Sequence, residues 1–245
     1  TNHAYDQGAS GILHSIQVFN KYPHITYLGL YKNEEEKQNI KIVKKNGIKI
    51  AFVSFNQYVN GVTYQEKLPY MINFHESTMM ENMKKARENA DIVIVSCHWG
   101  IEYDYYPNIF QKNMAKQLAD AGADVIIGTH THTLQDVEYI QRADGKRTLV
   151  AYSLGNFMSG MLEESCQLEG MLSFDIEKKK IKNVVFTPLV NYYTLTGKRE
   201  RHDFSVYRLK DYTNKLVEKH GFPNLTISHM KEEVKQKVKN IKIDM

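Results

Sequence analysis

The sequence has little cysteine and no long apolar run. Cys97 and Cys166 are the only cysteines in 245 residues, and they do not form a Cys-x-x-Cys pair. They exclude a disulfide framework and a cysteine-based metal or redox motif, and they do not fix the compartment. No stretch approaches the ~20 apolar residues of a membrane span, and no signal peptide opens the chain.

Two common catalytic signatures are also missing. There is no Gly-x-Ser-x-Gly motif, and Ser153 and Ser159 lack the context of a catalytic triad. A glycine-rich loop that could hold a phosphate is absent as well. The sequence therefore does not indicate a serine hydrolase or a nucleotide-binding P-loop protein.

The composition is that of a folded globular protein, with 42% hydrophobic, 11% aromatic and 24% charged residues. The net charge of +4 comes from short clusters such as 178-KKKIK-182 and 198-KRER-201 rather than from one periodic face. Such clusters are usually solvated turns, so a nucleic-acid partner is not indicated.

The central part of the chain predicts a βαβ unit. Residues 91–98 and 123–128 form apolar runs typical of strands covered on both faces, and residues 107–121 between them have helical spacing and end at Gly122. Two buried strands joined by a helix are expected to be parallel, with a right-handed crossover.

Other elements extend this unit into a mixed sheet, parallel in the middle and antiparallel toward its end. Asn46-Gly47, between two β-branched runs, predicts a hairpin with a type I′ turn. The other predicted elements are helices at 10–20, 76–90, 205–219 and 228–240, a strand at 148–154, and a hairpin formed by 171–176 and 181–190.

Three histidines follow the two central strands. His98 ends the first strand, and His130 and His132 follow the second. In open α/β sheets the carboxyl ends of the strands border the functional crevice. If the segment is extended, His130 and His132 point to the same side while Thr131 turns away. A lone histidine is usually a hydrogen-bonded core or surface residue, but three at neighbouring strand ends favour a metal site.

Several nearby residues keep two interpretations. Glu102 is a substrate or metal contact, or a surface glutamate. Asp6 orients the imidazole of His3, or it caps the helix that follows. Asn156 lines the site, or it belongs to an ordinary turn.

Two further side chains are the immediate neighbours of His98 in the sequence. Trp99 is a substrate-stacking residue or a core residue. Cys97 alternates with His98 and is expected to be a buried thiol that points away from the site.

Several short strings place these residues in a known pattern. The strings 2-NHAYDQG-8, 96-SCHWGIEY-103, 128-GTHTHTLQDVE-138 and 152-YSLGNF-157 resemble the CapA-type capsule-synthesis family, associated with poly-γ-glutamate, within the calcineurin-like metallophosphoesterases. The resemblance covers about residues 1–190. It implies a layered, metallophosphatase-like α/β sandwich with a mixed sheet.

The resemblance also implies roles for individual residues. Asn2, His98 and His130 would bind one divalent metal ion and His132 a second, with zinc, manganese or iron as the ion. His3 would be the general acid. From their places in the sequence, and not from the resemblance, we predict that Asp6 supports His3 and that Glu102, Trp99 and Asn156 contact the substrate. The family's earlier Asp-bearing motifs have no counterpart in this sequence, and we expect a further N-terminal segment.

Two functions follow. The first is a metal-dependent hydrolase of the phosphoesterase type in capsule synthesis, and the alternative is a non-catalytic accessory protein that binds an anionic capsule polymer during assembly or export. The expected partners are that polymer or its precursor and membrane-associated assembly proteins. The expected location is the cell envelope outside the cytoplasm, with an anchor beyond this sequence. We expect a main domain at 1–200 and a helical C-terminal appendage at 201–245.

Overall fold

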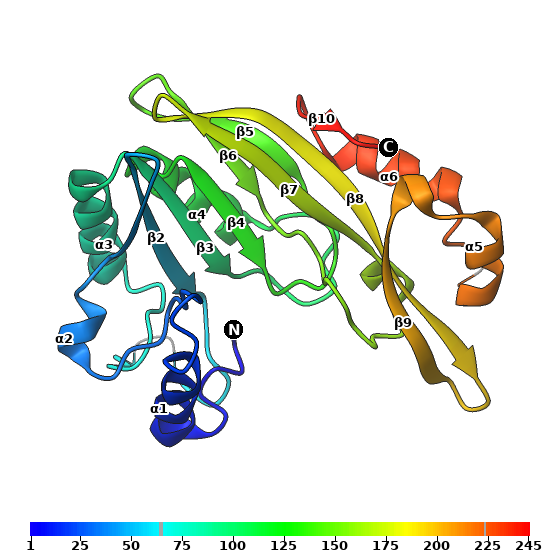
Figure 1. The fold of residues 1–245 in the computed structure, drawn as a ribbon, viewed down its shortest axis with the longest axis horizontal. Helices are drawn as coiled ribbons and strands as arrows, with labels where there is room; N and C mark the ends of the chain where they lie inside the picture. The colour runs from blue at the N-terminus through cyan, green and yellow to red at the C-terminus, as the bar shows by residue number, and fades with distance from the viewer. Residues whose placement is uncertain (64–65, 223) are drawn as a thin grey trace.

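The computed structural model describes residues 1–63, 66–222 and 224–245, and it contains two β-sheets with helices packed around them (Figure 1). The strands of the first sheet are β1 (Lys41–Lys45), β2 (Ile48–Asn56), β3 (Ile92–His98), β4 (Val125–Thr129), β5 (Val137–Gln141) and β6 (Arg147–Ala151). Those of the second are β7 (Leu168–Glu177), β8 (Lys180–Thr196), β9 (Glu200–Arg208) and β10 (Lys242–Ile243). The helices are α1 (Gly8–Phe19), α2 (Glu34–Lys37), α3 (Glu76–Asn89), α4 (Ile109–Asp120), α5 (Asn214–His220) and α6 (Ile227–Lys237).

The first sheet has the order β1-β2-β3-β4-β6-β5 and is parallel from β2 to β6. Its two edge strands are antiparallel to their neighbours. The predicted βαβ unit is therefore confirmed as β3-α4-β4 at the centre of the sheet. The hairpin between β1 and β2 is confirmed too, because Asn46 and Gly47 have φ values of 51° and 78°, the positive values that a type I′ turn requires.

Helices α3 and α4 cover one face of the first sheet. Alternate residues of β3, namely Val93, Val95 and Cys97, point into a fully buried core that also contains Met83 of α3 and Leu118 of α4. The strict alternation leaves the intervening residues of β3 on the opposite face. The prediction that Cys97 is a buried thiol is confirmed.

The second sheet packs on that opposite face, so the molecule is a layered sandwich. Val137 and Ala151 of the first sheet share a buried cluster with Phe186 and Val190 of β8 and with Val234 of α6. The predicted α/β class with a mixed sheet is confirmed. The hairpin of β7 and β8 is confirmed as well, but it belongs to this second sheet rather than to the end of the first.

The predicted helix at 205–219 is wrong in its first half. Ser205 and Val206 belong to β9, which pairs with β8, and helix α5 begins only at Asn214 after the capping side chain of Thr213. Cross-strand pairing with β8 overrides the local helical pattern in this segment. The division at residue 200 stays a prediction; β9 begins at that position and continues the second sheet.

Helix α1 lies beside the carboxyl end of β2 and has a small core of its own. Ile12 and Ile16 pack there with Val59, Leu68 and Met71. Within the described residues, no helix has both the length and the apolar character needed to cross a bilayer.

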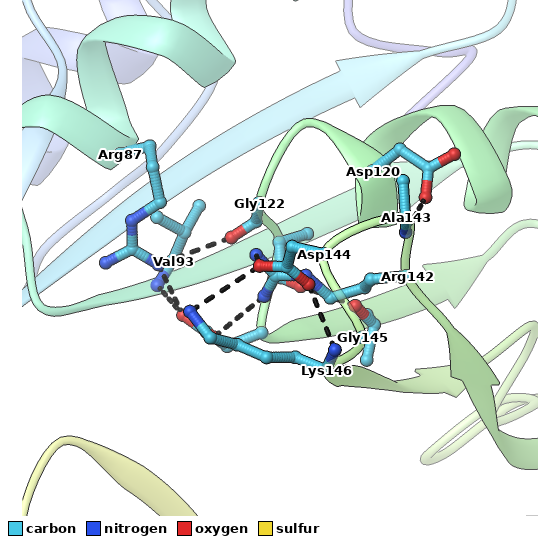
Figure 2. A network of polar contacts seen from close by, with 12 residues as sticks. Arg87, Val93, Asp120, Gly122, Arg142, Ala143, Asp144, Gly145 and Lys146 are labelled. Atoms are coloured by element: carbon cyan, nitrogen blue, oxygen red, sulfur yellow. Dashed lines mark hydrogen bonds and ion pairs between the residues drawn. The ribbon is translucent and has the colours of Figure 1, made fainter.

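A polar network fixes the amino-terminal ends of β3 and β4 (Figure 2). Asp124 is its centre: its carboxylate accepts hydrogen bonds from Arg87 Nη1 at 2.9 Å and from the Val93 amide at 2.8 Å. Arg142, with a side chain only 5% exposed, lies 3.4 Å from the same carboxylate and 3.0 Å from Asp144. The network therefore ties α3, β3 and β4 together at the edge of the sheet away from His98.

Replacing Asp124 by alanine is expected to lower the free energy of unfolding by about 2 kcal/mol, because it leaves the Val93 amide without its acceptor and removes one of the two carboxylates beside the buried Arg142 guanidinium. Urea denaturation followed by circular dichroism measures this loss. Glu88→Ala is the control, since Glu88 forms an exposed pair with Lys84 at 4.0 Å that contributes little. Equal stability of the two variants would contradict a structural role for the network.

Candidate metal centre

Polar side chains gather where the parallel strands of the first sheet end. Asn56 of β2, His98 of β3 and Thr129 of β4 are neighbours in register, so their side chains lie in one row across the sheet. His130 and His132 come directly after β4. The carboxyl edge of the sheet therefore brings together the histidines predicted from the sequence.

His98 lies on the face of β3 opposite the α3–α4 core. Partial burial is the main cause that lowers the pKa of its imidazole to about 2, and neighbouring positive groups, including the imidazoles of His130 and His132, lower it further. His98 is therefore neutral at physiological pH, which is the form that binds metal ions.

His130 and His132 do not lie in an extended segment, so this part of the prediction is wrong. Their φ values are 105° and 64°, and the chain turns sharply here. Positive φ is uncommon for residues with side chains and is held in place by the surrounding structure, often at functional sites. Thr131, fully buried between them, donates to the Thr133 carbonyl at 3.1 Å and does turn away from the two imidazoles.

Gly128, two residues before His130, has no space for a side chain. A Cβ atom on Gly128 would lie 1.9 Å from the Tyr152 carbonyl oxygen and 2.4 Å from Trp99 Nε1. No other residue fits between β4 and the segment that follows β6. Gly128 thereby allows these segments to approach closely at the site.

His98 and Asn2 face each other in an arrangement that suits a cation. The Thr129 hydroxyl oxygen lies 3.2 Å from both the Cys97 carbonyl oxygen and His98 Nδ1. His98 Nε2 lies 3.0 Å from Asn2 Oδ1. The Asn2 amide is held this way round because its Nδ2 donates to Asn60 Oδ1 at 3.3 Å. With its hydrogen on Nε2 the ring donates to Asn2, and with its hydrogen on Nδ1 the Nε2 and Oδ1 atoms are free to bind one cation.

His132 is oriented by the same principle. Its Nδ1 lies 2.8 Å from Asn156 Oδ1, and Asn156 Nδ2 donates back to the His132 carbonyl at 3.3 Å. The other ring nitrogen, Nε2, lies 3.9 Å from a carboxylate oxygen of Glu102. His132 and Glu102 are therefore a second pair of side chains that could bind a cation.

His130 lies between these two pairs. Its ring centre is 4.6 Å from that of His98 and 6.3 Å from that of His132. The prediction that His98 and His130 lie close enough to share an ion agrees with this distance. His130 Nδ1 is buried without a hydrogen-bond partner, and burial lowers the pKa of the ring.

His3 lies at the exposed side of the centre. Its Nδ1 is 2.7 Å from Asp6 Oδ2, as predicted, and 3.4 Å from Asn60 Nδ2. The alternative role of Asp6 as a helix cap is not observed, because α1 has Gln7 at its N-cap and no side-chain cap. Asp6 therefore orients the imidazole and leaves Nε2 directed outward.

The segment at 57–60, which directly follows β2, was missed by the sequence analysis. The Tyr58 hydroxyl contacts His130 Nε2, and the Asn60 backbone amide donates to the Asn2 carbonyl at 2.8 Å. The side chain of Gln57 accepts from the Gly100 amide at 2.8 Å. The position of this segment after a parallel strand could have marked it as part of the site, but the sequence analysis treated β2 only as part of a hairpin.

Trp99 corrects the prediction of a substrate-stacking residue. Its side chain is fully buried in the α3–α4 core, and its Nε1 donates to the Tyr152 carbonyl at 2.8 Å. It is the neighbour of His98 on the other face of the chain, so it cannot reach a substrate. Of the three predicted substrate contacts, Glu102 and Asn156 remain beside the histidines.

A cavity of about 630 Å³ opens on the His3 side of the centre. It lies between α1 and the exposed face of β2 and β3. His3 and His98 line it together with the hydroxyl side chains of Ser15, Ser54 and Ser96. The centre can therefore be reached by a ligand from this side.

The donors present suit a divalent ion in two mixed pairs rather than in one cluster. Across the described residues, no group of three or more His, Cys, Asp or Glu side chains is placed to hold a metal. The facing donors are instead Asn2 with His98, and His132 with Glu102. Neutral imidazoles with amide and carboxylate oxygens are ligands that zinc, manganese and iron accept.

Comparison with known proteins identifies a family and several relatives of this chain. The model of the bacterial capsule synthesis protein PGA_cap matches residues 1–161. A capsule biosynthesis protein CapA of Bacillus anthracis is 35% identical over 162 residues, which cover 64% of this chain and 38% of the relative. The PGA biosynthesis protein CapA of Bacillus subtilis is 30% identical over 190 residues, 77% of this chain and 48% of the relative. The chain thus spans less than half the length of either relative.

A solved structure, NAD nucleotidase (NadN) of Haemophilus influenzae, aligns with 99% of this chain and 41% of its own. The identity is 14% and the TM-score is 0.47, and a likeness at this level carries no argument about fold or activity.

Proposed function

Since this chain belongs to the bacterial capsule synthesis protein family PGA_cap, as its CapA-type resemblance predicted, we propose that it is a metal-dependent hydrolase of the phosphoesterase type. The observation that carries the proposal is the placing of Asn2 Oδ1 3.0 Å from His98 Nε2, with the ring centre of His130 4.6 Å from that of His98. An amide oxygen and two imidazoles gathered at the carboxyl ends of parallel strands are ligands that a divalent cation accepts.

The residues that would hold the ion are Asn2, His98 and His130, with His132 as the ligand of a second ion and Glu102 beside it. A divalent cation supplies Lewis-acid polarisation of a phosphoryl or carbonyl oxygen when it is bound. The protein's part is to hold the imidazoles in place. The hydroxyl of Thr129 and the amide of Asn156 do so for His98 and His132.

His3 and Asp6 supply proton transfer. Asp6 accepts the Nδ1 hydrogen of His3, so the proton on Nε2 of the charged ring can be given to a departing oxygen. The ring is exposed and lies in the wall of the cavity, where a leaving group can approach it. Glu102 and Asn156 border the same centre and would contact the substrate.

Replacing His130 by alanine is expected to weaken zinc or manganese binding by at least about 100-fold, because a ligand is lost from a site with few donors. Isothermal titration calorimetry and elemental analysis of the dialysed protein measure this. His14→Ala is the matched control, since His14 is exposed on α1 and does not line the cavity. If both variants keep the metal, or if both lose it equally, the histidines of the sheet edge are not its ligands.

The second candidate function is that of an accessory protein that binds an anionic capsule polymer without cleaving it. The observation that favours it is the turn between β8 and β9, where Arg199 and Arg201 are exposed. It has the same proposed setting: the cell envelope outside the cytoplasm, with membrane-associated assembly proteins as partners. Metal-loaded protein that cleaves no phosphate ester, but binds poly-γ-glutamate with an affinity that falls steeply with salt, would support this function instead.

A further inference from the structure

Exposed aromatic and apolar side chains lie in loops that contact His132 through Tyr103 and Asn156. They come from two loops, one between β3 and α4 and one after β6. We call this set the aromatic rim; its members and their exposed fractions are Ile101 (57%), Tyr103 (41%), Tyr105 (44%), Tyr106 (65%), Phe157 (68%) and Met158 (55%). So many large apolar side chains exposed in two neighbouring loops indicate a binding surface.

The aromatic rim is joined to the centre by direct contacts. The Tyr103 ring centre lies 6.1 Å from that of His132, and the Tyr103 amide donates to the Thr131 carbonyl at 2.8 Å. Phe157 directly follows Asn156, the residue that orients His132. A molecule bound at the metal centre would therefore touch the rim.

The backbone beneath the aromatic rim is held rigidly although its side chains are exposed. The ammonium of Lys237 in α6 donates to the carbonyls of Tyr105 at 2.6 Å and of Leu134 at 2.7 Å. It also lies 5.0 Å from the ring centres of both Tyr105 and Tyr106. Exposed rings on a fixed backbone lose little conformational entropy when they bind a ligand.

The charge beside Tyr103 and Tyr105 is acidic. Burial and the carboxylates of Glu163 and Glu102 raise the pKa of Tyr103, and burial together with Glu233 and Glu164 has the same effect on Tyr105. Of the cations nearby, Lys237 is buried with its hydrogen bonds going to backbone carbonyls, and Arg201 lies next to Gly160 in the loop after β6. A polyanion would be repelled from the rings of the loop between β3 and α4, so this part of the rim does not suit a chain of glutamate residues.

We propose that the aromatic rim binds an uncharged, hydroxyl-rich glycan portion of the substrate, next to the group that reacts at the metal centre. This rests on the proposed hydrolase function and adds a substrate class to it. Tyrosine and phenylalanine rings pack against the apolar C–H faces of sugar rings, as they do against other flat apolar groups. The carboxylates of Glu102 and Glu163 accept hydrogen bonds from hydroxyl groups, which are donors.

The proposal is tested by binding of the whole chain to an array of neutral oligosaccharides, with poly-γ-glutamate and poly-lysine as charged probes. Neutral oligosaccharides are expected to bind. Tyr106→Ala and Phe157→Ala should each weaken that binding by about tenfold, as loss of an aromatic anchor does. Both side chains are mostly exposed, so the fold should survive, and circular dichroism checks this. Tyr22→Ala is the control, because Tyr22 is 48% exposed outside the aromatic rim.

Three results would overturn the proposal: no oligosaccharide binds, only a charged polymer binds, or the rim variants bind as well as Tyr22→Ala does. Its failure can be told apart from failure of the hydrolase function. Oligosaccharide binding by a protein that cleaves no phosphate ester removes the hydrolase function alone. Cleavage of an aryl phosphate ester by a protein that binds no oligosaccharide removes the glycan proposal alone.

Discussion

Alanine in place of His3 is expected to lower the turnover of an alkyl phosphate ester by about 10²–10⁴-fold, the usual contribution of a general acid, while the bound metal stays in place. The reason is the division of tasks between neighbouring residues. His3 is exposed, and its Nδ1 lies 2.7 Å from Asp6 Oδ2. His98 and His130 are less exposed and are proposed as metal ligands. Steady-state kinetics with metal analysis of the same sample measures both quantities.

The leaving group provides the sharper form of this test. A nitrophenolate departs without a proton, so an aryl ester should lose much less activity in His3→Ala than an alkyl ester does. His202→Ala is the control, because His202 is half exposed on β9 and lies near Glu200. An equal loss for both esters would show that His3 does not act as the acid.

Glutamine in place of Glu169 is expected to raise the free energy of unfolding by about 3 kcal/mol at pH 7. Glu169 on β7 is fully buried, and neither of its carboxylate oxygens has a hydrogen-bond partner. This burial raises the pKa of the carboxyl to about 9 from 4.5. At pH 7 the side chain is ionised in the unfolded chain and neutral in the folded protein, and that difference opposes folding.

The sign of the pH dependence follows from the raised pKa. The free energy of unfolding of the wild-type protein falls as the pH rises from about 4.5 toward 9, because the Glu169 carboxyl ionises in the unfolded chain but not in the folded protein. Glutamine carries no charge to titrate, so the variant lacks this fall. Urea denaturation at pH 5 and pH 8 should therefore show a small advantage for Glu169→Gln at pH 5 and a large one at pH 8. Glu177→Gln, at an exposed position of the same strand, should change little. An advantage of equal size at both pH values would mean that ionisation is not its cause.

Much of the fold follows from local patterns in the sequence. The apolar runs of β3 and β4 and the helical spacing of α4 predict a parallel βαβ unit. Each of these patterns is visible within a short stretch of sequence. The closeness of His98 and His130 follows in turn, since the carboxyl ends of neighbouring parallel strands must lie together.

The parts that could not be predicted depend on contacts between distant segments. Tyr58 meets His130 across 72 residues, and Asn60 meets Asn2 across 58, so no local pattern marks them as site residues. Ser205 and Val206 are in a strand because β8 lies beside them, although their own spacing suits a helix. Trp99 was predicted as a substrate contact with a core residue as the alternative, and the structure places it in the core.

Gly128 and the histidines that follow it belong to one sequence motif but have different roles: the glycine is required by the fold, and the histidines by the chemistry of the site. The Tyr152 carbonyl and the Trp99 indole leave no room for a Cβ at this position, whether or not the histidines that follow bind anything. A relative that has exchanged both histidines for other residues would still require glycine there in order to close its sheet against the segment after β6. Retention of the glycine in a Gly-x-His-x-His pattern therefore reports an intact scaffold, and only the two histidines report on the chemistry of the site. A search that gives all three positions equal weight will count a conserved scaffold as if it were a conserved site.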